Sequence, residues 1–173
     1  TRYRFSDKLT LKISNDISLD TRDRGFVNLI TADSSIFGRR RLSVMVNTLS
    51  GKYLFKNNMS VTLNVRHYLS KGKYDQLYDV GQGGEFFGYS SDATAYNFTS
   101  SYFTVDLVYS WVFSPGSIFL ITYKNQILHD GGYDPATYFR NLSGTLSEPQ
   151  TNSLSLKVLY YLDYQMLRHH QRK

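Results

Sequence analysis

Apolar and polar residues alternate with a period of two along most of this chain, and that pattern predicts β-strands with two chemically different faces. Between Lys8 and Asp20 every odd position except Asn15 is apolar, and every even position is polar. The alternation returns in four later segments, 59–66, 102–113, 117–126 and 153–164. We therefore predict an all-β, antiparallel, up-and-down fold of six long strands, with a partial strand at 1–5.

The segment 41–55 supplies the remaining long strand, although its alternation changes phase. Val44 and Val46 fall on one parity, whereas Leu49 falls on the other. One extra residue in a strand reverses the faces of everything beyond it. A β-bulge near Asn47 would therefore reconcile the two halves.

Short and long connections alternate between these strands. Tight turns with suitable turn residues are predicted at Ser6-Asp7, 56–58 and 114–116. Long connections are predicted over 21–40, 70–101 and 129–150. Outer-membrane barrels alternate in this way, with short periplasmic turns and long external loops. The strands are also long enough to cross a membrane, because a tilted transmembrane strand needs about 9–11 residues.

Two of the long connections carry local structure of their own. Asp134 followed by Pro135 predicts a helix start, and the short helix would run to about Leu142. Within 21–40, the apolar residues of Phe26–Ile30 and of Ile36-Phe37 indicate a small hairpin that projects outside.

Composition is compatible with a membrane barrel. The mean hydropathy is -0.37, and no apolar run approaches the roughly 18 residues of a spanning helix. A barrel hides its lipid face in every second residue, so averaged hydropathy misses it.

The absence of Cys excludes disulfides, Cys-based zinc sites and thiol catalysis. A formal charge of +6 permits binding to nucleic acid or to an anionic membrane, but no aromatic and basic sheet surface indicates nucleic acid.

Charged residues of both signs fall on the polar parity, where we expect the lumen of a barrel: Lys12, Asp16, Arg66, Asp106, Lys124, Lys157 and Asp163. Because Arg66, Asp106 and Lys124 lie on consecutive strands, we predict cross-strand ion pairs in a polar interior. A catalytic role for Asp106 would need a histidine or a second acid beside it. His67 and His129 lie near the outer strand ends without such a partner. We therefore predict a protein that is not an enzyme and that uses no cofactor or metal.

Aromatic residues gather where strands meet the tight turns, and we expect them to form an interfacial girdle: Tyr53, Phe55, Trp111, Phe113 and Tyr164. The last strand resembles the C-terminal insertion signal of outer-membrane proteins. Its outward positions are Leu154, Leu156, Val158, Tyr160, Leu162 and Tyr164. The basic tail 165–173 departs from that pattern, because such signals end the chain at the aromatic residue.

Several motifs, in order along 26–164, resemble the C-terminal part of a family of large Gram-negative outer-membrane proteins. They include Ile36-Phe37-Gly38-Arg39-Arg40, Val105-Asp106-Leu107-Val108-Tyr109-Ser110-Trp111 and Phe113-Ser114-Pro115-Gly116-Ser117. Members of that family begin with a family-nine carbohydrate-binding-like domain, and their remainder is taken to be an outer-membrane barrel. The resemblance implies a barrel here. It carries over no catalytic residue and no glycan-binding residue.

The strand count favours a part of a larger barrel. Closed bacterial barrels contain about eight or more strands, in even numbers, and open edges in lipid cost several kcal/mol for each unpaired backbone group. Further strands upstream in the parent protein would close the barrel. The alternative is a complete barrel in which Phe26–Thr31 supplies an eighth strand, but that arrangement breaks the alternation of short and long connections.

We therefore predict that residues 1–164 are transmembrane barrel strands that anchor a larger surface or transport protein in the bacterial outer membrane, with a link to glycan or nutrient handling. The expected partners are outer-membrane lipid and lipopolysaccharide, the barrel-assembly machinery during insertion, and other envelope proteins. Nucleic acid is not expected. The alternatives are a complete small eight-stranded barrel with a structural or adhesion role, and a soluble lipocalin-like binding barrel with the apolar parity facing inward.

Overall fold

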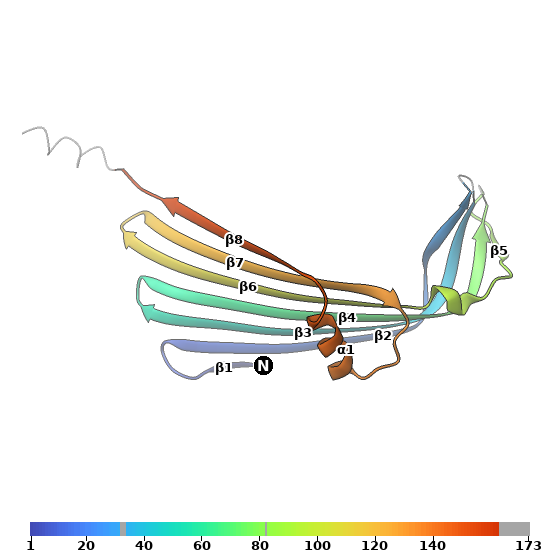
Figure 1. Cartoon of the computed structure of the whole chain (residues 1–173), viewed down its shortest axis with the longest axis horizontal. Coiled ribbons are helices and arrows are strands. Elements are labelled where there is room, and N and C mark those ends of the chain that lie inside the picture. Colours follow the sequence, from blue (N-terminus) through green and yellow to red (C-terminus); the bar gives the residue numbers. More distant parts are fainter. Residues whose placement is uncertain (32–33, 82, 163–173) are drawn as a thin grey trace, which may run out of the picture.

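The alternating segments form one open, curved, antiparallel sheet of eight strands (Figure 1). The computed structural model describes residues 1–31, 34–81 and 83–162. The elements, in chain order, are β1 (Arg2–Arg4), β2 (Leu9–Thr31), β3 (Ser34–Lys56), β4 (Met59–Val80), β5 (Phe86–Gly88), the 3₁₀-helix η1 (Ala93–Tyr96), β6 (Phe98–Ser114), β7 (Ser117–Gly132), α1 (Tyr138–Leu146) and β8 (Gln150–Leu159). The predicted all-β, up-and-down fold is confirmed, with its six long strands and the short N-terminal one.

Strands that follow one another along the chain also lie side by side, in the order β1-β2-β3-β4-β6-β7-β8. The short β5 lies off this path and pairs with β4. Among the residues described, β1 and β8 form the two edges of the sheet and do not pair with each other. The sheet is therefore not closed.

No helix in the described part of the chain is both long and apolar enough to cross a membrane.

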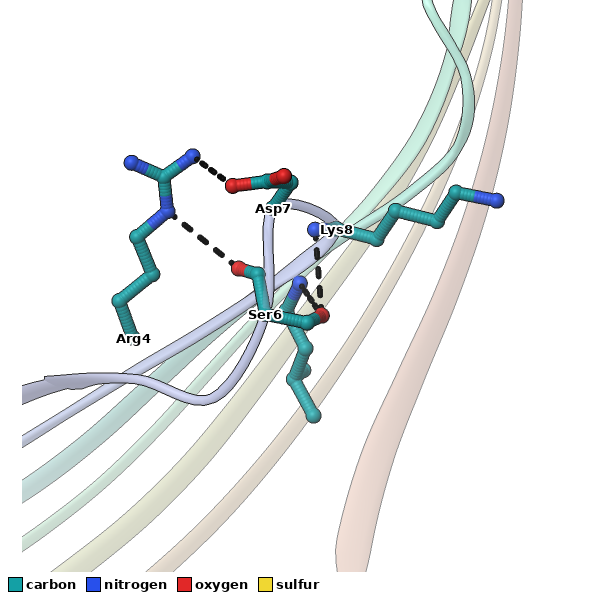
Figure 2. A network of polar contacts seen from close by, with 5 residues as sticks. Arg4, Ser6, Asp7 and Lys8 are labelled. Atoms are coloured by element: carbon teal, nitrogen blue, oxygen red, sulfur yellow. Dashed lines mark hydrogen bonds and ion pairs between the residues drawn. The ribbon is translucent and has the colours of Figure 1, made fainter.

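Three tight turns lie at one end of the sheet, which we call the turn end (left in Figure 1). At the first, Arg4 and Asp7 form an ion pair at 2.8 Å (Figure 2). The hydroxyl of Ser6 accepts hydrogen bonds from the backbone N–H groups of Lys8 and Leu9 at 3.2 and 3.1 Å. At the last turn Gly116 has a φ of 74°, which a side chain would oppose. The tight turns predicted at Ser6-Asp7, 56–58 and 114–116 are confirmed.

The β-bulge predicted near Asn47 is wrong. Asn47 pairs with Asn15 of β2 and with His67 of β4, and neither ladder shifts its register at that point. The alternation of β3 therefore continues unbroken, and Val44 and Val46 face the same side as the polar residues of the neighbouring strands. The apparent change of phase reflects two apolar residues on the polar side.

Regular strand replaces most of the first predicted long connection, over 21–40. β2 and β3 stay paired almost to their tips, where Phe26 lies opposite Phe37 with their ring centroids 6.0 Å apart. The small hairpin expected at Phe26–Ile30 is thus the continuation of two long strands. Side-chain alternation weakens here because bulges interrupt the register between Asp20 and Asp23.

The other two predicted connections are also shorter than expected. β4 continues to Val80, inside the predicted 70–101 connection, before β5 and η1 follow. The predicted helix exists, but α1 begins at Tyr138 and ends at Leu146. Asp134 does not cap it, because its carboxylate accepts a hydrogen bond from the N–H of Ala136 in the preceding turn.

The end of the sheet opposite the turns, which we call the loop end, holds β5 and η1, while α1 lies about midway along the long strands (Figure 1). A buried apolar cluster lies there and consists of Ile36, Tyr74 and Leu77. Partly buried neighbours pack around it: Val27, Tyr89, Ala93, Tyr96 and Phe98. The long strands thus extend beyond α1 into a small packed unit at the loop end.

Candidate functional site

The register of the sheet gathers the apolar residues of neighbouring strands on one surface, which we call the apolar face. Ile13 lies opposite Leu49, Leu49 opposite Val65, and Val65 opposite Val105. Much of this face is uncovered, since the exposed fractions are 60% for Ile13 and 66% for Leu156. Exposed apolar surfaces are typical of sites that contact a protein, a membrane or a ligand.

Two pairs of asparagines interrupt the apolar face without leaving their amides unpaired. Asn15 donates a hydrogen bond to the side-chain oxygen of Asn47, and Asn125 donates one to Asn152 at 2.8 Å. Each pair joins directly opposed positions of adjacent strands. Their mutual hydrogen bonds reduce the cost of placing amides among apolar neighbours.

The opposite surface, which we call the polar face, carries the charged residues that the alternation predicted. Lys12 opposes Ser50, and Asp106 lies between Asn64 on one side and Lys124 on the other. The other predicted positions on this face within the described residues are Asp16, Arg66 and Lys157. Asp163 lies outside the described residues.

One predicted ion pair forms on the polar face, where Lys124 Nζ lies 3.4 Å from Asp106 Oδ1. Arg66 does not extend this pair, because it lies opposite Thr104, two residues along the strand from Asp106. Arg66 instead lines a hollow of about 440 Å³ whose wall is formed by Arg66, Tyr68, Tyr102, Thr104, Gln126 and Leu128. The rings of Tyr68 and Tyr102 stack there with an interplanar angle of 9°, an arrangement that sequence spacing did not reveal.

Four of the aromatic residues predicted to form a girdle lie as two ring pairs at the turn end. The ring centroids of Tyr53 and Phe55 lie 4.9 Å apart, and those of Trp111 and Phe113 lie 5.7 Å apart. Tyr164, the fifth predicted member, lies outside the described residues.

Three further aromatic residues join this end of the sheet. Tyr3 and Phe5 of the short N-terminal hairpin lie edge to face at 4.4 Å, and Tyr160 stacks on Phe113 at 6.2 Å. Tyr3 and Phe5 were missed because three residues of β1 are too few for a periodic signal.

The last strand is shorter than the alternation over 153–164 predicted. β8 ends at Leu159, so Leu154, Leu156 and Val158 lie in the strand while Tyr160 and Leu162 follow it. All five are exposed, at 61–68%, and β8 is the edge of the sheet. The tail 165–173 lies outside the described residues.

The helix α1 lies on the apolar face, where its Tyr138 and Leu142 line a hollow together with Ile13, Leu49 and Val65. The hydroxyl of Tyr138, the first residue of the helix, lies 2.9 Å from Nδ1 of His67. The other ring nitrogen of His67 lies 2.9 Å from the hydroxyl of Ser101. Thr145, seven residues later in α1, donates a hydrogen bond to the same Ser101 oxygen at 2.6 Å. His67, Ser101 and Thr145 are exposed by only 3%, 1% and 1%.

The segment that leads into α1 is also held against the sheet. The ammonium group of Lys71 donates hydrogen bonds to the backbone carbonyls of Asp134 and Ala136 at 2.8 and 2.7 Å. The hydroxyl of Thr99 accepts one from the N–H of Asp134 at 2.9 Å. After the helix, His129 Nδ1 lies 2.8 Å from Glu148 Oε1.

A model for a domain of unknown function, DUF5916, matches residues 1–171. This chain belongs to the DUF5916 family. No curated protein and no solved structure matches it. The family assignment is consistent with the β-rich fold described above.

The contact between Ser101 and His67 invites comparison with a nucleophile and its base. In this DUF5916 chain, however, Ser101 is buried beneath α1 and already accepts the hydroxyl of Thr145. Among the residues that the structure describes, no carboxylate orients the histidine, whose second nitrogen faces the hydroxyl of Tyr138. We interpret this chain of hydroxyls and imidazole as the attachment of α1 to the sheet.

The arginine run of this DUF5916 chain is divided between the two faces. Arg40 contacts Asp23 and donates a hydrogen bond to the hydroxyl of Tyr74 at 2.8 Å. Partial burial opposes its charge, but these hydrogen bonds outweigh burial and raise the pKa of Arg40. Arg39 pairs with Asp75 at 2.9 Å, and this hydrogen bond raises the pKa of Arg39.

In the described part of the chain, no group of three His, Cys, Asp or Glu side chains could hold a metal ion.

Proposed function

We propose that this DUF5916 chain forms transmembrane strands of a β-barrel that anchors its protein in the bacterial outer membrane. The observation that supports this most directly is the division of one sheet into an exposed apolar face and a charged polar face. Leu156 of the apolar face is 66% exposed, whereas the next residue, Lys157, belongs to the polar face. A sheet that faces lipid on one side and an aqueous lumen on the other requires this division.

The positions of the aromatic residues support the same proposal. Trp111 and Phe113 lie beside the turn of β6 and β7, and Tyr53 and Phe55 lie beside the turn of β3 and β4. Membrane interfaces favour such residues, because an aromatic ring is apolar while its polar edge can reach headgroups. In this arrangement the turn end faces the periplasm and the loop end faces the exterior.

The open edges of the sheet support a larger barrel. β1 and β8 leave one side of their backbone without strand partners among the described residues, and unpaired backbone groups in lipid cost several kcal/mol each. Strands from elsewhere in the same protein would satisfy both edges. The resemblance to large proteins with a carbohydrate-binding-like domain supports an anchor for glycan or nutrient handling at the cell surface. Barrel-assembly machinery would insert the strands, and envelope proteins and lipopolysaccharide would surround them.

One observation favours a second arrangement, a soluble lipocalin-like barrel with its apolar face inward. The helix α1 lies on the apolar face, with Ser101 and Thr145 buried between helix and sheet. A helix inside a barrel would account for this contact. The membrane proposal instead places α1 outside the barrel at the level of the outer headgroups, where its Phe139, 77% exposed, faces lipid.

Expression of the full-length protein with an export signal in a Gram-negative host tests the proposal. We expect the protein in the outer-membrane fraction, extractable with detergent, and with an electrophoretic mobility that changes on boiling. A detergent-free, monodisperse monomer would contradict it and would favour the lipocalin-like arrangement. The variant Lys157→Glu reverses a charge on the polar face and leaves the lipid-facing surface intact. As a control, it should enter the outer-membrane fraction like the wild type.

A further inference from the structure

Two cations lie directly opposite each other on the apolar face, near the loop end. Arg41 of β3 pairs with Lys73 of β4 in the ladder, and both side chains are exposed. Like charges at directly opposed positions repel each other and destabilise a sheet. Within the described residues Arg41 forms no ion pair or hydrogen bond, so the repulsion is not relieved by a nearby carboxylate. An anionic ligand would relieve it.

These cations line a hollow of about 420 Å³. It lies at a step in the sheet, because β6 begins at Phe98 opposite Gly72 while β4 continues beyond that point. The other lining residues are Tyr74, Asp75, Thr94, Asn97 and Tyr133. The ammonium group of Lys73 lies 4.4 Å from the centroid of the Tyr133 ring. The hollow thus offers two positive charges beside hydroxyl and amide groups.

The charge around the hollow remains positive when its carboxylate is included. Asp75 lines the hollow, but it is bound to Arg39 at 2.9 Å. Arg24 lies opposite Arg39 on the neighbouring strand and adds another cation on this side of the sheet. Asp75 is therefore already neutralised, and the charges of Arg41 and Lys73 remain available to a ligand.

The position of the cations relative to the apolar face limits what the ligand can be. Ser43 lies opposite Leu19, and Arg41 follows two residues further along β3, about 7 Å away. Leu19 and Ile17 are 71% and 58% exposed. An apolar stripe that ends in exposed cations matches the order of an anionic lipid, in which acyl chains end in a charged headgroup.

We propose that Arg41, Lys73 and Tyr133 bind the phosphate of a lipopolysaccharide lipid whose acyl chains lie against Ile17 and Leu19. This inference rests on the proposed function, because it requires the apolar face to point into the outer leaflet. Lipid A supplies phosphate groups at the height of the headgroups. The site would hold the protein at a fixed depth in the outer leaflet.

The test measures binding of fluorescent, phosphorylated lipid A to the detergent-solubilised full-length protein. The variant Arg41→Gln/Lys73→Gln removes both charges from the site. A matched control, Lys12→Gln/Lys52→Gln, removes two cations from the polar face of adjacent strands. We expect the first variant to bind lipid A about 30-fold more weakly, since the two cations near an anionic headgroup together contribute about 2 kcal/mol. The control should bind like the wild type, and the exchange Arg41→Lys/Lys73→Arg should retain binding.

Two further arms identify the source of the phosphate. Dephosphorylated lipid A should bind the wild type as weakly as phosphorylated lipid A binds the double glutamine variant. Inorganic phosphate at high millimolar concentration should compete poorly, because it cannot use the apolar stripe. Full competition by inorganic phosphate would overturn the lipid assignment and leave a free-anion site.

Equal affinity of the wild type and the Arg41→Gln/Lys73→Gln variant for lipid A would overturn the inference. Fractionation of the same proteins separates this failure from a failure of the proposed function. Normal insertion into the outer membrane with unchanged lipid A binding removes only the phosphate site. If the wild-type protein does not enter the outer membrane, both the proposed function and the phosphate site are contradicted.

Discussion

The hydroxyl oxygen of Tyr138 in α1 lies 2.9 Å from Nδ1 of His67 in β4, with the two rings edge to face at 5.1 Å. This contact joins residues 71 positions apart in the chain. Together with Ser101 and Thr145 it fixes a polar connection beneath the helix, on a face that is otherwise apolar. The position of α1 therefore depends on a few hydrogen bonds.

The substitution His67→Ala should release α1 from the sheet. It leaves the hydroxyls of Tyr138 and Ser101 without their common partner, and an unsatisfied buried group costs about 1–3 kcal/mol. Hydrogen exchange measured by mass spectrometry should show faster exchange of the amides of 138–146. Phe139→Ala is the matched control, because that side chain is 77% exposed. Unchanged protection in His67→Ala would mean that other contacts hold the helix.

The substitution Leu156→Arg should destabilise the inserted protein by about 2–4 kcal/mol if residue 156 lies near the bilayer midplane. Ser155→Arg is the matched control, since its side chain projects from the polar face of the same strand. Urea unfolding in lipid vesicles gives the free energy of unfolding of each variant. If Ser155→Arg proves the more damaging of the two, the assignment of the faces to lipid and lumen is reversed.

The alternation of single residues was enough to predict the strands and both faces of the sheet. From Leu9 to Leu19 each odd residue lies on the apolar face, because consecutive side chains of a strand point to opposite sides. The phase of β3 could not be read in this way. Val44 and Val46 are apolar residues on the polar face, and only the hydrogen-bonded ladders with both neighbours establish their side.

Contacts between distant segments lay beyond sequence reasoning. The cross-strand pair Lys124 and Asp106 was predictable, because both lie on consecutive strands with the right parity. The attachment of α1 to His67 was not, since helix periodicity says nothing about which part of the sheet a helix will cover. The opposition of Arg41 and Lys73 likewise depends on the register, which no local pattern in either strand determines.

The substitution Gly38→Ala should disrupt the packed unit at the loop end. A Cβ at Gly38 would overlap the ring of Tyr74, and Tyr74 belongs to the buried cluster there. Overpacking of this kind costs about 1–3 kcal/mol. Limited proteolysis should cut residues 21–40 faster in this variant. Gly83→Ala is the matched control, because its Cβ would meet nothing within 4 Å, and equal proteolysis of both variants would contradict the packing argument.

Trp111 is the single tryptophan of this chain, so its fluorescence reports the depth of the turn end in a membrane. Lipids brominated near the carbonyl groups should quench it more strongly than lipids brominated at the chain ends. In a variant with Trp111→Phe and Leu107→Trp the order should reverse, because four residues of strand move the indole about 13 Å toward the bilayer centre before tilt is considered. A variant with Trp111→Phe and Val108→Trp places the indole on the polar face and should escape quenching by both lipids. Strong quenching at 108 but not at 107 would instead require the apolar face to point inward, as in the lipocalin-like arrangement.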